Sequence, residues 1–175
     1  GLPAGVLNVV ACDDPVAGSL VQNPGFRKIL FTGSVPTGRR IMASAAAQGT
    51  PVTLELGGKD PAVVCADADL ERASSGIVWA AFLNAGQTCA SVERVYVEEG
   101  IADAFIAKVI EKTRALKLGD PLDPNTDVGP LTLERQRQIV EAQVGEARAK
   151  GAEIRTGGLR PEGPGHFYPP TVLLN

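Results

Sequence analysis

The chain has 175 residues, of which 44% are hydrophobic and 21% charged, and its formal net charge is −3. This length and apolar content suffice for one ordinary globular core. A slightly acidic chain without a basic stripe lacks the electrostatic footprint of a nucleic-acid binder. Its longest apolar stretch, residues 77–83, is far shorter than the roughly 20 residues that cross a bilayer. We therefore expect a soluble protein that binds neither nucleic acid nor membrane.

The first third of the chain predicts alternating strands and helices. Apolar residues 6–10 predict a short buried strand, and Asp14 before a proline predicts the N-cap of a helix over residues 15–21 that Gly25 ends. Residues 28–32 predict the next strand. Strand, helix and strand in this order indicate a parallel sheet, as in part of a nucleotide-binding fold.

A turn at residues 33–38 leads into a helix that we expect to reach Gln48, with Gly49 as its stop. Ser34 can cap this helix, and free amides of its first turn form an anion site suited to a pyrophosphate or its neighbouring ribose. The turn matches neither a P-loop nor the Gly-x-Gly-x-x-Gly fingerprint. From spacing alone it is either a cofactor site or an ordinary glycine-bounded helix start.

Residues 51–56 predict a strand that delivers Glu55 to the pair Gly57 and Gly58, which marks a turn or hinge. We place a domain boundary here, between residues 1–57 and 58–175. By itself Glu55 is either a solvated carboxylate at a strand end or a base that takes a proton from water.

Further strands and helices follow. Residues 62–65 predict a strand, and Asp67 or Asp69 can cap a helix over residues 70–84 that we expect to bury Trp79 and Phe82. The remaining expected elements are a strand at 92–97, helices at 101–116 and 132–150, loops at 118–131 and 157–169, and an apolar strand at 171–174 with nothing to pair against. That last strand suggests that the chain is a fragment.

The three cysteines are widely spaced and odd in number, which favours a reducing compartment, and we expect the cytoplasm. Cys12 and Cys65 are predicted to be small core residues. Cys89 differs because it follows a helix end in a polar turn, where nucleophiles tend to lie, although a packed thiol is the alternative. With His166 as the only histidine and no Cys-x-x-Cys spacing, we expect no metal site.

A carboxylate and a thiol can together perform covalent catalysis. A thiolate at Cys89 would attack a carbonyl carbon, and Glu55 would activate the water that hydrolyses the acyl intermediate. The loop residue His166 is a less favoured candidate base for the thiol.

Five short motifs carry a resemblance to a known family. They are Phe-Thr-Gly-Ser at 31–34, Leu-Glu-Leu-Gly-Gly-Lys at 54–59, Gly-Gln-Thr-Cys at 86–89, Val-Gly-Pro-Leu at 128–131 and Tyr-Pro-Pro-Thr-Val at 168–172. Each motif alone is weak, but the ordered set resembles the central part of an NAD(P)-dependent aldehyde dehydrogenase.

The resemblance implies an α/β fold: part of a Rossmann-like nucleotide-binding domain, residues 1–57, followed by part of an α/β catalytic domain with a mostly parallel sheet, residues 58–175. It implies oxidation of an aldehyde to a carboxylic acid, with Cys89 as nucleophile, Glu55 as general base and NAD or NADP as cofactor. The residues that it places beside the cofactor are Gly33, Ser34, Gly38, Leu56 and Gly57.

The resemblance also sets limits. The oxyanion asparagine of the family belongs to a motif upstream of Gly1, so we expect these 175 residues alone to bind cofactor poorly and not to turn over. A full-length member is expected to be a homo-oligomer. One rival is a coenzyme A-acylating aldehyde dehydrogenase, against which Glu55 argues because that branch generally lacks the base. A phosphorylating glyceraldehyde-type enzyme is disfavoured because it pairs a histidine with its cysteine. The other rival is a non-catalytic nucleotide-binding or structural relic.

Overall fold

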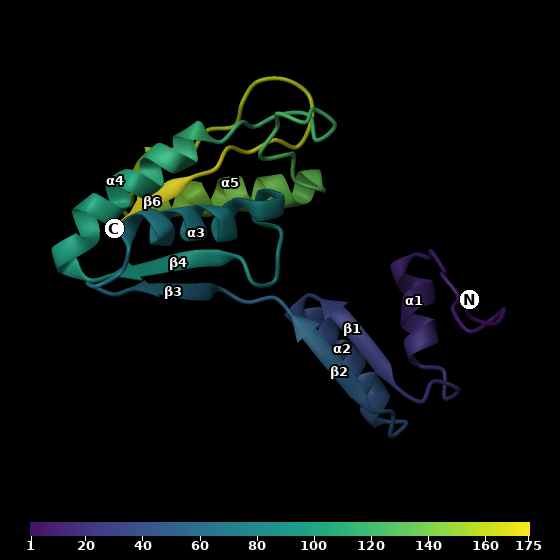
Figure 1. The fold of residues 1–175 in the computed structure, drawn as a ribbon. Helices are drawn as coiled ribbons and strands as arrows, with labels where there is room; N and C mark the ends of the chain where they lie inside the picture. Colours follow the sequence, from purple (N-terminus) through teal and green to yellow (C-terminus); the bar gives the residue numbers. More distant parts are fainter. The chain divides into compact units, whose positions relative to one another are not determined.

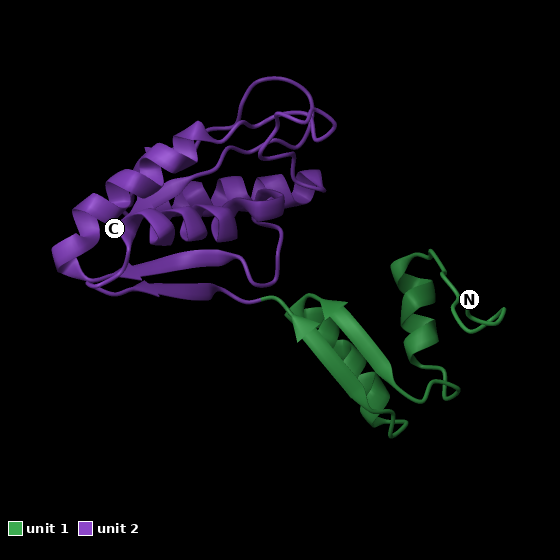
Figure 2. Cartoon of the chain, viewed as in Figure 1, with its two compact units in different colours: residues 1–57 green, residues 58–175 purple.

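A computed structural model describes all 175 residues, which form two compact units, Gly1–Gly57 and Gly58–Asn175 (Figure 2). Each unit mixes helices with parallel strands, which confirms the expected α/β class. The assignment of the first unit to cofactor binding and of the second to catalysis stays a prediction. No helix combines the length and the apolar content that a membrane crossing requires.

The first unit is a parallel strand pair joined by a helix (Figure 1). Helix α2 joins the two strands and contacts both of them. Each strand begins one residue later than its sequence suggests, because Lys28 and Pro51 lie outside the ladder. The elements of this unit are α1 (Asp14–Val21), β1 (Ile29–Gly33), α2 (Val35–Ala46) and β2 (Val52–Leu56).

The beginning of the first unit differs from the prediction. Residues 6–10 form no strand, and Val9 is 91% exposed. The prediction was wrong because β1 and β2 pair only with each other, so no strand lies beside this apolar run to take up its backbone groups. The N-cap is Asp13, whose carboxylate accepts a hydrogen bond from the Val16 amide at 3.1 Å, and Asp14 is the first helical residue.

The second unit contains one parallel and one antiparallel strand pair. Strands β3 and β4 are parallel, while β5 and β6 are antiparallel. The strand at 92–97 has its expected bounds, and the three long helices lie close to theirs. The elements are β3 (Asp60–Val64), α3 (Leu70–Phe82), the short 3-10 helix η1 (Leu83–Gly86), β4 (Val92–Val97), α4 (Glu99–Ala115), α5 (Glu134–Ala149), β5 (Glu153–Thr156) and β6 (Val172–Leu174).

Two apolar clusters form the core of the second unit. The first packs β3 and α3 against α4 through four buried side chains, and α3 and α4 lie beside the β3–β4 pair in Figure 1. Phe105 at its centre is 2% exposed, and burial of such a side chain contributes about 1.5–3 kcal/mol. The second cluster joins α5 to the loops at Leu131 and Tyr168. The members of the first cluster are Val64, Val78, Phe105 and Val109.

Three predictions about strand pairing and burial are wrong. Strand 171–174 does have a partner, β5. The sequence did not predict β5 because two of its four residues are charged and only one is apolar. Trp79 is 66% exposed, since it follows the inward-facing Val78 and the helical rotation carries it away from the core. Cys65 is exposed because it follows the buried Val64 at the end of β3, and Cys12 is exposed beside the unpaired run.

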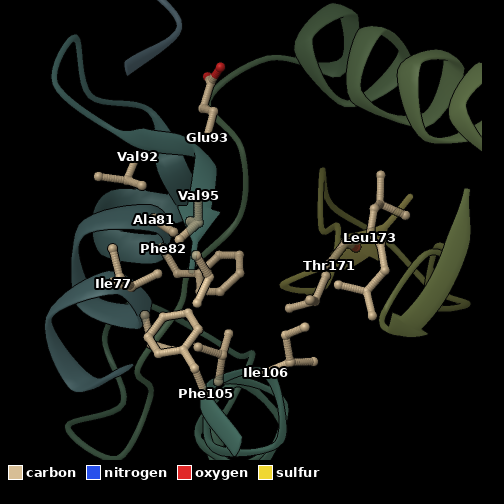
Figure 3. Close-up of a pocket in the computed structure, with 15 residues that line it drawn as sticks. Ile77, Ala81, Phe82, Val92, Glu93, Val95, Phe105, Ile106, Thr171 and Leu173 are labelled. Carbon is tan, nitrogen blue, oxygen red and sulfur yellow. The ribbon is translucent and has the colours of Figure 1, made fainter. Parts of the chain in front are cut away.

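An apolar hollow of about 350 Å³ opens in the second unit between β4, α3, α4 and β6. Figure 3 shows Val95 of β4 on one side, Leu173 of β6 on the other, and Phe105 and Ile106 of α4 between them. Because β4 pairs only with β3 and β6 only with β5, each of these strands has one unpaired edge. The hollow therefore lies where no strand joins β4 to β6.

Candidate active site

One edge of the first unit gathers most of the predicted cofactor residues. Because β1 and β2 are parallel and Gly33 pairs with Leu56, the carboxyl ends of both strands meet at this edge. Ser34 follows directly as the N-cap of α2, and Gly57 follows Leu56. Ligands of open α/β sheets bind outside the carboxyl ends of the strands. The edge is therefore suited to a ligand, and its cofactor role stays a prediction.

The N-terminus of α2 offers fewer free amides than its sequence suggested. The Thr37 amide donates to the Ser34 hydroxyl at 3.4 Å, and the Gly38 amide donates to the Ser34 carbonyl at 2.9 Å. Pro36 has no N–H, so only the Val35 amide of the first turn is left. An anion here would depend on the helix dipole and on nearby cations rather than on a cradle of amides.

Arg40 supplies such a cation. Its guanidinium donates to the Thr37 hydroxyl at 3.1 Å, and that hydroxyl also accepts from Ser34 at 3.0 Å. This network holds a positive charge one turn into α2, beside the strand ends. Sequence reasoning missed Arg40, since it considered the residue only as a mismatch to the P-loop. The usable signal is its spacing, three residues after a capping-turn threonine.

Gly38 lies beneath this edge rather than on it. It is buried, and a Cβ atom placed on it would lie 2.7 Å from a terminal methyl of Leu56. The glycine therefore lets α2 pack closely on β2 and sets the position of Leu56. By contrast, a Cβ atom on Gly57 would meet nothing within 4 Å. The space next to Gly57 is open to a bound molecule.

Glu55 lies on the opposite face of β2 from α2. Side chains alternate along a strand, so Glu55 points away from Leu54 and Leu56, which are half-buried. Its neighbour across the ladder is Thr32, and both are exposed. Its carboxylate makes no ion pair or hydrogen bond. A carboxylate without a partner is free to accept a proton from water, which is what a general base requires.

The turn that carries Cys89 has an unusual backbone. After α3 ends, Asn84 (φ 54°), Ala85 (φ 56°) and Gly86 (φ 75°) are all left-handed. For residues with a Cβ atom this conformation costs roughly 1–2 kcal/mol each. Such strain persists only where surrounding contacts impose it, and it concentrates at functional sites.

Several hydrogen bonds impose this conformation. The side chains of Asn84 and Gln87 each donate to the other's backbone carbonyl, at 3.2 and 3.1 Å. The side-chain oxygen of Gln87 accepts from the Thr132 amide at 2.9 Å. The buried hydroxyl of Ser91 donates to the Ala81 carbonyl at 3.2 Å. Sequence reasoning assigned no role to Gln87 or Asn84, because residue types alone do not signal this backbone geometry.

Cys89 itself is exposed at the tip of the turn, as expected for a nucleophile in a loop. The Thr88 amide donates to Gly86 and the Ser91 amide to Thr88. The amides of Cys89 and Ala90 have no partner in the chain. Two free donors next to a thiol can stabilise a thiolate, or an oxyanion formed from a carbonyl group bound to it.

His166 is bonded elsewhere. Its Nδ1 lies 3.0 Å from a carboxylate oxygen of Glu134, and its carbonyl accepts from the Leu131 amide at 3.0 Å. It therefore joins its loop to the start of α5, which agrees with the loop role and gives no support to a base for Cys89. Glu55 belongs to the first unit and Cys89 to the second.

Comparison with known proteins identifies the family. The family model described as "Aldehyde dehydrogenase family" matches residues 1–175. The chain belongs to the aldehyde dehydrogenase family. Aldehyde dehydrogenases are NAD(P)-dependent oxidoreductases.

Named relatives and solved structures agree with this assignment. The betaine aldehyde dehydrogenase of Cereibacter sphaeroides is 45% identical over 175 residues, which are 100% of this chain and 36% of that protein. Lactaldehyde dehydrogenase from Escherichia coli superposes with a TM-score of 0.87 at 44% identity, covering 90% of this chain and 33% of that one. The NAD+ complex of an aldehyde dehydrogenase from Bacillus cereus superposes with a TM-score of 0.86 at 34% identity, and the match covers 90% of this chain and 32% of that one. The chain thus spans about a third of the length of these aldehyde dehydrogenases.

Proposed function

We propose that this chain is the segment of an aldehyde dehydrogenase that carries its nucleophile and its general base, for oxidation of an aldehyde to a carboxylic acid with NAD(P)+. The observation that carries the proposal is the Cys89 turn: an exposed thiol beside two unpartnered amides, on a strained and firmly bonded backbone. The relatives named above act on different aldehydes by name, so we propose the reaction that they share rather than one substrate.

The first half of the reaction takes place at Cys89. Its thiolate adds to the aldehyde carbon, the carbonyl oxygen becomes an oxyanion, and the Cys89 amide donates a hydrogen bond to that oxygen. Bound NAD(P)+ would accept the hydride that leaves this carbon. Loss of the hydride converts the thiohemiacetal into a thioester on the same sulfur.

The second half uses Glu55. Its carboxylate, which has no partner within its unit, takes a proton from the water that attacks the thioester carbon. The carbon–sulfur bond then breaks, which releases the carboxylic acid and restores Cys89.

The cofactor would lie at the strand edge of the first unit. Ser34, Leu56 and Gly57 lie there, the space beside Gly57 is open, and Arg40 provides a positive charge for a phosphate. The edge fits a nicotinamide nucleotide in these respects. A cytoplasmic location and a homo-oligomeric full-length enzyme remain predictions.

The first test is the relative reactivity of the three thiols. All three cysteines are exposed, so accessibility alone predicts similar labelling by iodoacetamide. We expect Cys89 to be alkylated about tenfold faster near neutral pH, because its turn is held by side-chain hydrogen bonds and places two unpartnered amides next to the thiol. Peptide mass spectrometry after short pulses measures each site, and Cys65→Ser serves as a control that leaves the Cys89 rate unchanged. Equal rates at the three sites would favour the non-catalytic alternative.

The second test uses a chimera in which residues 1–175 replace the matching segment of the Cereibacter betaine aldehyde dehydrogenase. We expect the chimera to form NADH or NADPH and Cys89→Ser to abolish this. Glu55→Gln should lower acid release by about 10²–10⁴, the usual size of general-base catalysis, and leave a thioester on Cys89. Acid release that requires coenzyme A would favour the acylating rival. The 175-residue chain alone is expected not to turn over, and steady NADH production by it would contradict that.

A further inference from the structure

Both the nitrogen and the oxygen of the Gln87 side-chain amide make hydrogen bonds. Its nitrogen donates to the Asn84 carbonyl at 3.1 Å, within the turn, and its oxygen accepts from the Thr132 amide at 2.9 Å, from a segment far along the chain. A neutral side-chain amide can donate from its nitrogen and accept at its oxygen at the same time. The side chain therefore ties the Cys89 turn to a second, distant part of the unit.

That distant segment is firmly anchored. Leu131, next to Thr132, is 7% exposed and packs with Val144 and Tyr168 in the second apolar cluster. Its amide donates to His166 at 3.0 Å. The turn also contacts this cluster directly through Ala85, one of its left-handed residues. One polar and one apolar contact thus bind the turn to the same cluster.

We propose that Gln87 is a positioning residue for Cys89, a role that rests on the proposed function of Cys89 as nucleophile. Asn84 and Ala85 are held in a conformation that they do not prefer, and Gln87 bonds to Asn84 on one side and to the cluster on the other. It thereby holds the turn that carries Cys89 and the two unpartnered amides. Without it the left-handed residues relax and the position of Cys89 is no longer fixed.

The reactivity of Cys89 is the property that depends on this turn. Unpartnered amides can stabilise the charge that develops when a neighbouring sulfur attacks, and they do so only while the turn is held. Loss of Gln87 should therefore lower the alkylation rate of Cys89 in a chain that is still folded. A residue that only stabilises the fold would change the unfolding free energy without changing this rate.

The test uses the intact chain with Cys12→Ser and Cys65→Ser, so that Cys89 is the only thiol. Gln87→Leu removes the amide and keeps a neutral side chain of similar size. Its control is Gln143→Leu, which changes an exposed glutamine outside the turn, on α5. We expect Gln87→Leu to slow alkylation by iodoacetamide at pH 7.5 at least about fivefold, the effect of losing one net hydrogen bond. Gln143→Leu should react at the rate of the parent chain.

A rescue variant tests the strain itself. Ala85→Gly in the Gln87→Leu background should recover part of the rate, because glycine adopts the left-handed conformation without a steric penalty. If Gln87→Leu does not fold by circular dichroism, Gln87→Asn replaces it, with Gln143→Asn as its control. Asparagine keeps the amide but is too short to reach both partners, so the same change in rate is expected.

The outcomes separate the two proposals. A parent-like alkylation rate in the folded Gln87 variant would overturn the positioning role, provided that Cys89 still reacts fastest of the three cysteines in the unsubstituted chain. Similar reactivity of the three thiols in that chain would instead overturn the proposed function.

Discussion

Gly38 on α2 and Leu56 on β2 approach each other so closely that no methyl group fits between them. This contact places Leu56 at the strand edge where the cofactor is proposed to bind. The absence of a side chain at Gly38 therefore affects both how α2 packs on β2 and where Leu56 lies.

Gly38→Ala tests this contact. The added Cβ atom would lie 2.7 Å from a Leu56 methyl, an overpacking that costs about 1–3 kcal/mol, while alanine's helix propensity returns about 1 kcal/mol. We expect a net loss of about 1 kcal/mol in urea unfolding of the first unit. Gly18→Ala is the matched control, because a Cβ atom at Gly18 in α1 meets nothing within 4 Å, and it should be neutral or stabilising. Equal effects of the two changes would contradict the close contact.

Residue types alone left the roles of Cys89 and Glu55 open. A thiol in a polar turn could be packed and a carboxylate at a strand end could be merely solvated, so it was the resemblance to the family that assigned both roles, which stay predictions. The hydrogen bonds of Gln87 and Arg40 were not predicted, since they depend on backbone geometry and on partners that only folding brings near. The cofactor role of Gly38 stays a prediction, and the structure adds its close contact with Leu56, which the sequence did not indicate.

At the scale of elements, α5 is joined to the neighbouring loop by an ion cluster around the buried Arg137. Arg137 is 4% exposed and donates to Glu134 and, at 2.6 Å, to Glu141, while Glu134 also bonds to His166. The Arg137 guanidinium is the main reason that the pKa of Glu134 falls from its ordinary 4.5 to about 2. The cluster therefore holds the first turn of α5 and the loop around His166 together.

This cluster predicts a pH dependence of stability. Because the pKa of Glu134 is lowered on folding, its contribution is complete above pH 4.5 and is lost as the pH falls toward 2. We expect Glu134→Gln to destabilise the second unit at pH 6 and to flatten the loss of stability between pH 4.5 and 2. Urea unfolding at several pH values measures this. Glu162→Gln, in an exposed loop without an ion pair, should follow the unsubstituted curve, and a Glu134→Gln curve parallel to it would contradict the prediction.

The elements that the sequence predicted well are those whose signals are local. Strand β4 and helices α4 and α5 carry strong apolar periodicity and lie where expected. The errors in strand prediction arise where the formation of a strand depends on a pairing partner. Residues 6–10 have a strand-like composition but no neighbouring strand. Strand β5 has few strand-forming residues but pairs with β6. Whether a strand forms depends on a partner elsewhere in the chain, which periodicity does not report.

At the scale of the whole molecule, the core is unevenly distributed. Both apolar clusters belong to the second unit, whereas Ile41 and Ala45 are the only buried hydrophobic residues of the first. Burial of apolar area is the main favourable contribution to folding. The first unit should therefore open with a smaller free energy than the second.

Hydrogen exchange on the intact chain measures this difference. We expect amides of β1 and β2 to exchange before those of β3, β4 and α4, and residues 6–10 to show no protection because they form no ladder. Mass spectrometry of peptic fragments assigns the rates. Uniform protection across both units would show that they unfold as one cooperative body.

The exposure of Cys89 also has a practical consequence for storage. A sulfur that is open to an aldehyde is equally open to peroxide, and the more readily it ionises, the faster it is oxidised. Aerated buffer should first yield a sulfenic acid or mixed disulfide, which dithiothreitol reverses, and later a sulfinic acid, which it does not. Preparations kept without reductant would thus lose their reactive thiol while the fold around it stays intact.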